Sequence, residues 1–169
     1  GSEVTSDCMF KGNLDMNKVR DAVSRAGTEN VAFIRVEAGT NLIGGQPVSL
    51  ANMREVSAYC KEQGIMSVLD ASLLADNLYF IKVREEECQE RSLDDIVLEI
   101  GSLFDIIYFS GRKLGCARGG GICTNNETYL SQMREFIPLF EGFLTYGGMS
   151  VREMEAIAVG LKETLDLDV

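Results

Sequence analysis

The chain has 169 residues, of which 46% are hydrophobic and 25% are charged, a composition typical of one globular domain. Its formal net charge of −10 argues against a nucleic-acid-binding protein, which needs a basic stripe for the phosphate backbone. Histidine is absent, which removes Ser-His-Asp and Cys-His catalysis and every histidine metal site. Proton transfer must therefore rest on Lys, Asp, Glu, Tyr or Cys.

The five cysteines are odd in number and include no Cys-x-x-Cys spacing. This usage predicts reduced thiols in the cytoplasm rather than a disulfide or zinc framework. We find no secretory signal and no apolar run long enough to span a bilayer. Residues 1–2 (Gly-Ser) are interpreted as a cloning scar, and residues 3–169 are expected to form a single α/β domain.

Apolar residues recur at helical or strand spacing along most of the chain, and glycine, proline and N-cap residues separate the periodic segments. The pattern predicts helices over 15–26, 49–63, 72–80, 92–101, 125–137 and from 150 towards the C-terminus, with Gly101 and Pro138 ending two of them. It predicts strands over 31–36, 65–69 and 106–109, and a short strand after the Gly-rich turn at 116–124. The charge run Lys82–Arg91 is expected to be a solvated loop or helix end.

Strands that alternate with helices of about 10–15 residues indicate a parallel sheet with helices on its faces. We therefore predict an α/β fold, a three-layer α/β/α arrangement with a mostly parallel sheet.

The strand predicted at 106–109 runs directly into Ser110, Gly111, Arg112 and Lys113. Ligands collect where the strands of an open α/β sheet end, so Lys113 is expected at the mouth of a pocket. A lysine held partly out of water can act as a nucleophilic amine or form a Schiff base. The alternative is an ordinary surface lysine after a strand.

Ligand-type side chains follow three successive strands, namely Asn41, Asp70 and Lys113. In a parallel sheet they share one edge, so an amide, a carboxylate and an amine can converge there. This set suits pyridoxal phosphate, whose aldehyde needs a lysine and whose pyridine nitrogen needs a carboxylate. Ser110 can donate to the phosphate. The alternatives are a helix cap for Asp70, a turn residue for Asn41 and turn chemistry for Ser110.

Several blocks of the sequence resemble the tryptophanase and tyrosine phenol-lyase family of pyridoxal-phosphate lyases. The blocks are Phe-Lys-Gly-Asn at 10–13, Asn-Leu-Ile-Gly-Gly-Gln-Pro-Val-Ser-Leu-Ala-Asn-Met-Arg at 41–54, Asp-Ala at 70–71, Asn-Leu-Tyr-Phe-Ile-Lys at 77–82, Ser-Gly-Arg-Lys at 110–113, Tyr-Gly-Gly at 146–148 and Arg-Glu-Met-Glu-Ala at 152–156. The Gly-Gly-Gln-Pro-Val-Ser segment is the most specific of them.

The resemblance implies that Lys113 forms the Schiff base with the cofactor and acts as the base on the substrate α-carbon. It implies that Asp70 pairs with the pyridinium nitrogen, that Asn41 contacts cofactor or substrate, and that Ser110 lies near the phosphate. Arg112 stands where the family usually has lysine and is included among the cofactor-binding residues. The implied reaction is β-elimination from an aromatic amino acid, which gives pyruvate, ammonia and indole or phenol.

Besides Arg112, the chain departs from the family pattern at four positions. Leu114 replaces the aspartate that usually follows the lysine, and Ser72 and Leu73 replace Thr-Arg, so an active-site arginine is missing. Arg118 replaces an asparagine near the family's monovalent-cation site and would disfavour a bound potassium ion.

The resemblance runs from about Phe10 to Lys162 and corresponds to the later part of the family's large cofactor-binding domain. It implies that the phosphate-binding turn, the aromatic residue that stacks on the ring and the arginine for the substrate carboxylate lie outside the matched span. We therefore expect a fragment with little or no lyase activity, whose uncovered sheet edges favour a homo-oligomer. The alternative is a catalytically silent scaffold or assembly module.

Overall fold

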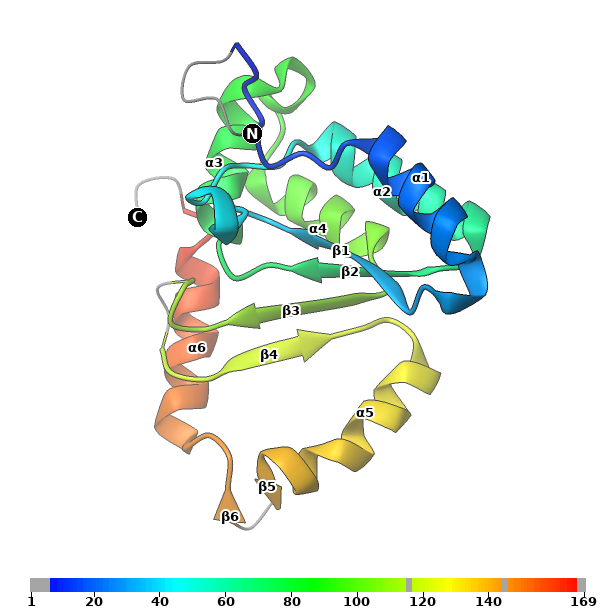
Figure 1. Ribbon diagram of the computed structural model, residues 1–169. Coiled ribbons are helices and arrows are strands. Elements are labelled where there is room, and N and C mark those ends of the chain that lie inside the picture. The colour runs from blue at the N-terminus through cyan, green and yellow to red at the C-terminus, as the bar shows by residue number, and fades with distance from the viewer. Residues whose placement is uncertain (1–6, 115–116, 144–145, 167–169) are drawn as a thin grey trace.

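The computed structural model describes residues 7–114, 117–143 and 146–166, and Figure 1 shows its elements in chain order. The α-helices are α1 (Met16–Ala26), α2 (Leu50–Gln63), α3 (Leu74–Arg84), α4 (Leu93–Leu103), α5 (Glu127–Phe140) and α6 (Val151–Glu163). The strands are β1 (Phe33–Glu37), β2 (Met66–Asp70), β3 (Ile106–Ser110), β4 (Gly120–Cys123), β5 (Gly142–Phe143) and β6 (Tyr146–Gly147). Short 3-10 helices occur at η1 (Thr28–Asn30), η2 (Asn41–Ile43) and η3 (Glu86–Cys88).

The longer strands form one sheet in the order β1-β2-β3-β4. The first three strands are parallel, and β4 runs antiparallel to β3. The register pairs Glu37 with Asp70 and Asp70 with Tyr108, so these three residues lie side by side on one face of the sheet. The predicted α/β fold with a mostly parallel sheet is confirmed.

The core lies between the sheet and the helices α2, α3 and α4. Burial alternates along β1, where Ile34 and Val36 are buried while Phe33 and Arg35 are exposed. The buried face of the sheet joins apolar side chains of the helices in one cluster, which includes Val36, Leu69, Met53, Val56, Leu78, Ile96 and Ile100. Figure 1 looks onto the other face, with α2 and α4 behind the strands. That face carries Arg35 and Tyr108.

Serine side chains begin three of the helices. Ser49 Oγ accepts a hydrogen bond from the Asn52 backbone N–H at the start of α2. At α4, Ser92 Oγ accepts one from the Asp95 backbone N–H. At α6, Ser150 and Glu153 form a capping box, in which each side chain accepts from the other residue's backbone N–H.

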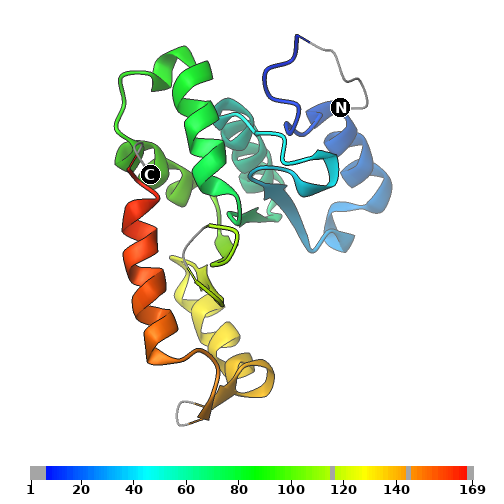
Figure 2. The same cartoon turned by 90° about the vertical axis from the view of Figure 1, so that its left-hand side faces the viewer.

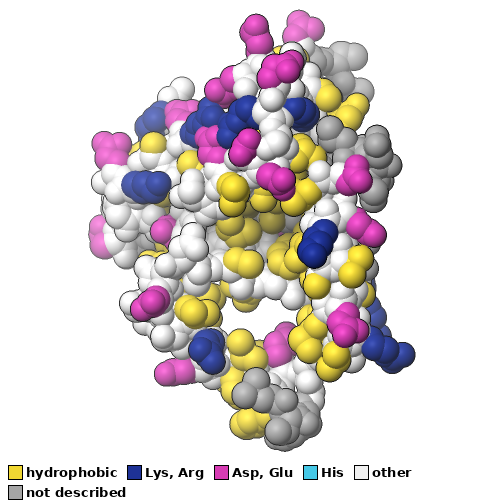
Figure 3. Space-filling model, turned by 180° about the vertical axis from the view of Figure 1, so that it is seen from behind, with side chains coloured by type: hydrophobic (Ala, Val, Ile, Leu, Met, Phe, Trp, Pro, Cys, Tyr) yellow, Lys and Arg dark blue, Asp and Glu magenta, His cyan; other side chains and the backbone are white. Residues whose placement is uncertain are grey.

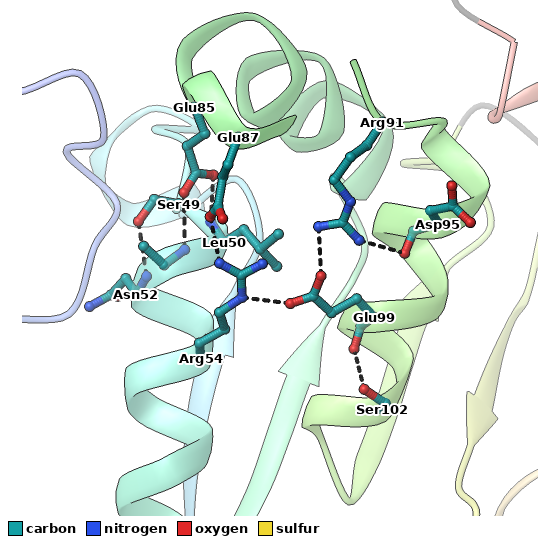
Figure 4. Close-up of polar contacts among 11 residues, drawn as sticks. Ser49, Leu50, Asn52, Arg54, Glu85, Glu87, Arg91, Asp95, Glu99 and Ser102 are labelled. Carbon is teal, nitrogen blue, oxygen red and sulfur yellow. Dashed lines mark hydrogen bonds and ion pairs between the residues drawn. The ribbon is translucent and has the colours of Figure 1, made fainter. Parts of the chain in front are cut away.

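The charge run at 82–91 forms the end of α3 and η3, and its side chains hold α2 and α4 together (Figure 4). Arg54 of α2 donates hydrogen bonds to Glu87 and to Glu99 of α4. Arg91 pairs with the other carboxylate oxygen of Glu99 at 2.6 Å. The Glu85 carboxylate lies at the N-terminus of α2. These side chains are therefore tied to two helices and are not simply solvated.

Three of the predicted helix ends are wrong, and α3 runs on to Arg84 rather than ending at residue 80. Helix α4 continues through Gly101 to Leu103. Ser57 Oγ donates a hydrogen bond to the Leu103 carbonyl, which has no partner within the helix. The Leu103 side chain also packs against the core. Helix α5 continues through Pro138 to Phe140, and the Glu141 backbone N–H donates to the Ile137 carbonyl. A proline removes one helical hydrogen bond, and here the helix runs on past it.

After β4 the chain leads away from the sheet through α5 and the β5–β6 hairpin (Figures 1 and 2). Helix α5 has no buried residue among those described, and the β5–β6 hairpin after it has two residues per strand and was not predicted. Helix α6 returns to the sheet and buries Ile157 and Gly160. From behind, hydrophobic side chains gather in a hollow beside α6 (Figure 3). This hollow has a volume of about 270 Å³ and includes Leu69, Leu74, Phe109 and Leu161 in its lining.

Cys60, Cys88 and Cys123 are free thiols, and Cys116 lies outside the described residues. Within residues 7–114, 117–143 and 146–166, no helix combines the length and the apolar character needed to cross a membrane.

Candidate active site at the C-terminal edge of the sheet

The carboxyl ends of β1, β2 and β3 meet at one edge of the sheet, on the left in Figure 1. Asp70 is the last residue of β2, Ser110 is the last residue of β3, and Lys113 lies in the turn that follows β3. Asn41 begins η2, four residues after the end of β1. The topology therefore brings these four of the five predicted site residues to one edge, as expected for an open α/β sheet.

Asp70 is the most buried member of this group, with 9% of its surface exposed. Its Oδ1 accepts a hydrogen bond from the backbone N–H of Ser72 at 3.0 Å. Its Oδ2 accepts one from the hydroxyl of Tyr108 at 3.0 Å. Helix α3 begins later, at Leu74, and its N-cap residue Leu73 makes no side-chain cap, so Asp70 does not cap this helix. Both oxygens of the carboxylate are held in place before any ligand is present.

Tyr108 and Arg35 were not predicted as site residues. The Arg35 guanidinium donates from Nη1 to the Tyr108 hydroxyl oxygen at 3.2 Å. Burial raises the pKa of the Tyr108 phenol; the hydrogen bond from Arg35 opposes this, and the hydrogen bond to Asp70 adds to it. The hydrogen bond with Tyr108 raises the pKa of Arg35. A protonated phenol therefore lies between a cation and a carboxylate.

Ser110 and Asp70 are both hydrogen-bonded to Ser72, which connects them. The Ser110 backbone N–H donates to Ser72 Oγ at 3.1 Å, and the backbone N–H of Ser72 donates to Asp70. The Ser110 carbonyl accepts from the backbone N–H groups of Lys113 and Leu114, which closes a tight turn after β3. Ser110 is half-buried and is the last residue of β3, at the edge of the sheet where Asp70 ends β2.

Arg112 and Lys113 are exposed, and they lie between the buried residues Gly111 and Leu114. The turn is packed closely, since a Cβ on Gly111 would lie 2.6 Å from the Ala117 carbonyl and 3.2 Å from Ile157 of α6. This packing fixes the backbone that carries the two cations. The predicted roles of both side chains remain predictions.

Asn41 lies in a loop from Thr40 to Gln46 that folds back on itself. The Thr40 N–H donates to the Gln46 carbonyl, and the Gly45 N–H donates to the Thr40 carbonyl, both at 2.9 Å. The Asn41 backbone N–H donates to Glu37 Oε1 at 3.2 Å, which ties the loop to the end of β1. The Asn41 side chain is exposed, so it is free of the core and available at the edge of the sheet.

The Phe-Lys-Gly-Asn block at 10–13 has a structural role in building this loop. Gly12 N–H donates to the Pro47 carbonyl at 3.0 Å, and a Cβ on Gly12 would lie 2.4 Å from the Gln46 carbonyl, so only glycine fits. The Asn13 side chain exchanges two hydrogen bonds with Ser49, from Nδ2 to Oγ and from the Ser49 N–H to Oδ1. The motif therefore anchors the end of the loop at the start of α2.

Asn77 of α3 is a third residue that the sequence did not reveal. It is 1% exposed, and its side-chain oxygen accepts from the N–H groups of Gly39 at 3.2 Å and Val48 at 2.8 Å. Its Nδ2 donates to the Val48 carbonyl at 2.9 Å. Asn77 thus holds both ends of the loop that carries Asn41. A polar residue on an otherwise apolar helix face was the one available signal.

The structure also places the residues that depart from the family pattern. Leu73 packs against Gly39, where an added Cβ would lie 2.7 Å from the Leu73 Cβ. Arg118 Nε lies 3.9 Å from Glu153 Oε1 of the α6 capping box. Across the described segments, no group of three or more Cys, Asp or Glu side chains is placed to hold a metal ion.

The donor set fits pyridoxal phosphate. A carboxylate has about four acceptor sites, and the contacts of Asp70 use two of them, so a protonated ring nitrogen can still be accepted. The hydroxyl of Ser110 and the cations of Arg112 and Lys113 lie in one turn, where a phosphate and an aldehyde can be met by complementary groups.

Comparison with solved structures first establishes the class of fold. The chain aligns with a threonine aldolase from Leishmania major with a TM-score of 0.62 at 21% identity, covering 96% of this chain and 43% of that one. It aligns with CalE6, a methionine gamma lyase from Micromonospora echinospora, with a TM-score of 0.52 at 13% identity, covering 92% of this chain and 41% of that one. The predicted likeness to part of the large domain of fold-type I pyridoxal-phosphate enzymes is confirmed.

The family follows from the sequence comparisons. The model of the beta-eliminating lyase family matches residues 2–163, and the chain therefore belongs to this family. It is 41% identical over 161 residues to a tyrosine phenol-lyase of Pasteurella multocida, covering 95% of this chain and 35% of the relative. It is 39% identical over 167 residues to a tyrosine phenol-lyase of Clostridium tetani, covering 98% of this chain and 36% of the relative. The chain thus spans about a third of the length of these relatives.

Proposed function

We propose that the chain supplies part of the active site of a pyridoxal-phosphate-dependent lyase that carries out β-elimination on an aromatic amino acid. The products would be pyruvate, ammonia and phenol or indole. The observation that carries the proposal is the buried, doubly hydrogen-bonded carboxylate of Asp70 at the C-terminal edge of a parallel sheet, in a chain of this family. The relatives named tyrosine phenol-lyase make tyrosine the first substrate to test and tryptophan the second.

When bound, the cofactor supplies an aldehyde that reacts with an amine and a ring that withdraws electrons from the substrate α-carbon. Asp70 would accept a hydrogen bond from the ring nitrogen and keep it protonated, since an anion favours the charged form of its partner. The Lys113 amine would bind the aldehyde and later take the proton from the α-carbon. The Ser110 hydroxyl would donate to the phosphate, beside the positive charge of Arg112, and Asn41 would hydrogen-bond the ring oxygen or the substrate carboxylate.

The experiment that tests this site is chemical trapping. The protein is incubated with pyridoxal phosphate and reduced with borohydride, and the adduct is located by peptide mass spectrometry. We expect one stoichiometric adduct on Lys113, which Lys113→Arg abolishes. Lys61→Arg is the matched control, because Lys61 is also exposed but lies at the end of α2, at the opposite edge of the sheet. Adducts spread over the surface lysines without preference for Lys113 would overturn the proposal.

The chain spans about a third of its relatives, so we expect it to release little or no pyruvate from tyrosine or tryptophan by itself. Supplying the remaining segments of a full-length relative should restore release if the site is intact. Release above background from the 169-residue chain alone would contradict this expectation.

A second candidate function is a silent assembly module. It is favoured by Leu73, Leu114 and Arg118, and by the exposed apolar side chains of α5 and α6, which include Leu139, Phe140 and Val159. This function predicts no activity even with the remaining segments supplied. We also propose a cytoplasmic location. We propose in addition that the chain forms a homo-oligomer, and light scattering on the purified chain would test its oligomeric state.

A further inference from the structure

Three polar side chains form a line across the open face of the sheet, one from each parallel strand. Arg35 comes from β1, Tyr108 from β3 and Asp70 from β2, which lies between them. Arginine can only donate hydrogen bonds, so the Tyr108 hydroxyl oxygen accepts one from Arg35 at 3.2 Å. The hydroxyl in turn donates a hydrogen bond to Asp70 at 3.0 Å. Both hydrogen bonds therefore donate in the same direction, from the Arg35 cation towards the Asp70 carboxylate.

The line holds Asp70 from one side while the backbone holds it from the other. Ser72 N–H reaches Oδ1 and the Tyr108 hydroxyl reaches Oδ2, so rotation of the carboxylate breaks at least one hydrogen bond. A preorganised group loses less free energy on binding a ligand than one that must first be ordered.

The charges around the line are consistent with this role. Arg35 Nη2 lies 3.9 Å from Glu37 Oε2, and Glu37 is the register partner of Asp70. Among the described residues, the charged groups that act on Tyr108 and Arg35 are the Arg35 cation and the carboxylates of Glu37 and Asp70. Burial and Asp70 keep the pKa of the Tyr108 phenol above its ordinary value of 10.0, so the hydroxyl remains a donor at neutral pH.

We propose that Tyr108, oriented by Arg35, is a positioning residue that fixes the Asp70 carboxylate for the ring nitrogen of pyridoxal phosphate. The inference rests on the proposed function, because it assigns a role to Asp70 in cofactor binding. Neither Tyr108 nor Arg35 lies in the sequence blocks that carry the family resemblance.

The first test needs no cofactor. Tyrosine is labelled with ¹³C at the ring carbon that bears the hydroxyl, and the Tyr108 signal is followed by NMR as the pH rises. Asp70→Asn should lower the midpoint of the Tyr108 titration by about 1 pH unit, because it removes the neighbouring negative charge. Arg35→Gln should raise the midpoint, because it removes the cation. Tyr129 of α5 is the internal control, and its chemical shift should be the same in all variants.

The second test measures cofactor affinity. Tyr108→Phe keeps the ring and removes only the hydroxyl, and Tyr79→Phe is the matched control at an exposed position of α3. We expect Tyr108→Phe to weaken pyridoxal phosphate binding about tenfold, the effect of one lost hydrogen bond to a charged group. Arg35→Gln should weaken it in the same direction, although Arg35 has no contact with Asp70 among the hydrogen bonds of the described residues. Thermal unfolding of each variant checks that the fold is kept.

The outcomes separate the inference from the proposed function. One outcome is a Lys113 adduct together with a Tyr108 titration midpoint that is the same with and without Asp70→Asn. This outcome overturns the inference and leaves the proposed function standing. A Lys113 adduct together with unchanged affinity in Tyr108→Phe does the same. If no Lys113 adduct forms in the unmodified protein, both are overturned.

Discussion

The Glu85 carboxylate caps α2 from a position 35 residues later in the chain, with Oε2 2.7 Å from the backbone nitrogen of Leu50. Its Oε1 accepts from the Ala51 N–H at 3.0 Å, so one side chain satisfies two of the free N–H groups at the helix start. Helix α2 forms the central part of the core and begins directly after the loop that carries Asn41. The end of α3 therefore stabilises the element on which that loop rests.

Replacing Glu85 with alanine should lower the free energy of unfolding by about 1–2 kcal/mol, because two helix N–H groups lose a charged acceptor. Glu85→Gln keeps one carbonyl acceptor and should cost less. Glu90→Ala is the control, because Glu90 is exposed in the same charge run. Urea denaturation measures all three. Equal stability of Glu85→Ala and Glu90→Ala would show that the cap contributes nothing.

Asn77→Ala should be among the most destabilising single changes, at about 2–4 kcal/mol, because it leaves buried backbone groups of Gly39 and Val48 without partners. Asn41→Ala should change stability by less than about 0.5 kcal/mol, since that side chain is exposed in the same loop. Thermal unfolding measures both. Faster hydrogen exchange at the Val48 amide in Asn77→Ala alone would locate the effect in the loop.

Stability should fall in acid partly through Glu99. The hydrogen bond from Arg54, together with Arg91, lowers the pKa of Glu99 below its ordinary value of 4.5. The unfolded chain takes up the proton first as the pH falls, so this contribution is present above about pH 4.5 and is lost as the pH falls through the folded pKa. Glu99→Gln should therefore flatten the acid side of the stability curve. The exposed Glu62→Gln should leave it unchanged, and an equal slope in both variants would refute the assignment.

Replacing either of two glycines with alanine should change the stability of the protein, in opposite directions at the two positions. A Cβ on Gly120 of β4 would lie 2.1 Å from the Phe109 carbonyl, so Gly120→Ala must separate β3 from β4 and should destabilise by about 1–3 kcal/mol. Gly101 lies within α4 with nothing within 4 Å of an added Cβ, so Gly101→Ala should stabilise by about 1 kcal/mol. Chemical denaturation measures both. Stabilisation by Gly120→Ala would contradict the strand pairing.

The main elements could be predicted from sequence because periodicity reports which side of an element is buried. The rule that ligands gather at the ends of parallel strands was enough to place Asp70, Ser110 and Lys113 at one edge. Elements without a periodic signal were harder to foresee. The β5–β6 hairpin has two residues per strand, and the continuation of α5 past Pro138 depends on its local surroundings.

Tyr108 and Arg35 could not be found from the sequence for a different reason. Each looks like an ordinary strand residue, and the hydrogen bond between them joins positions 73 residues apart. The role of Asn77 likewise depends on two backbone groups far from it in sequence. Such pairings exist only once the register of the sheet and the packing of α3 are set.

Helix α5 has 14 residues and contributes no buried side chain among those described. It is held at its start by the Asn126 side chain, which accepts from the N–H groups of Thr128 and Tyr129. Melting this helix breaks no contact of the core, whereas melting α2 or α4 removes side chains from the centre of it. Local unfolding of α5 is therefore expected to leave the core that supports Asp70 intact.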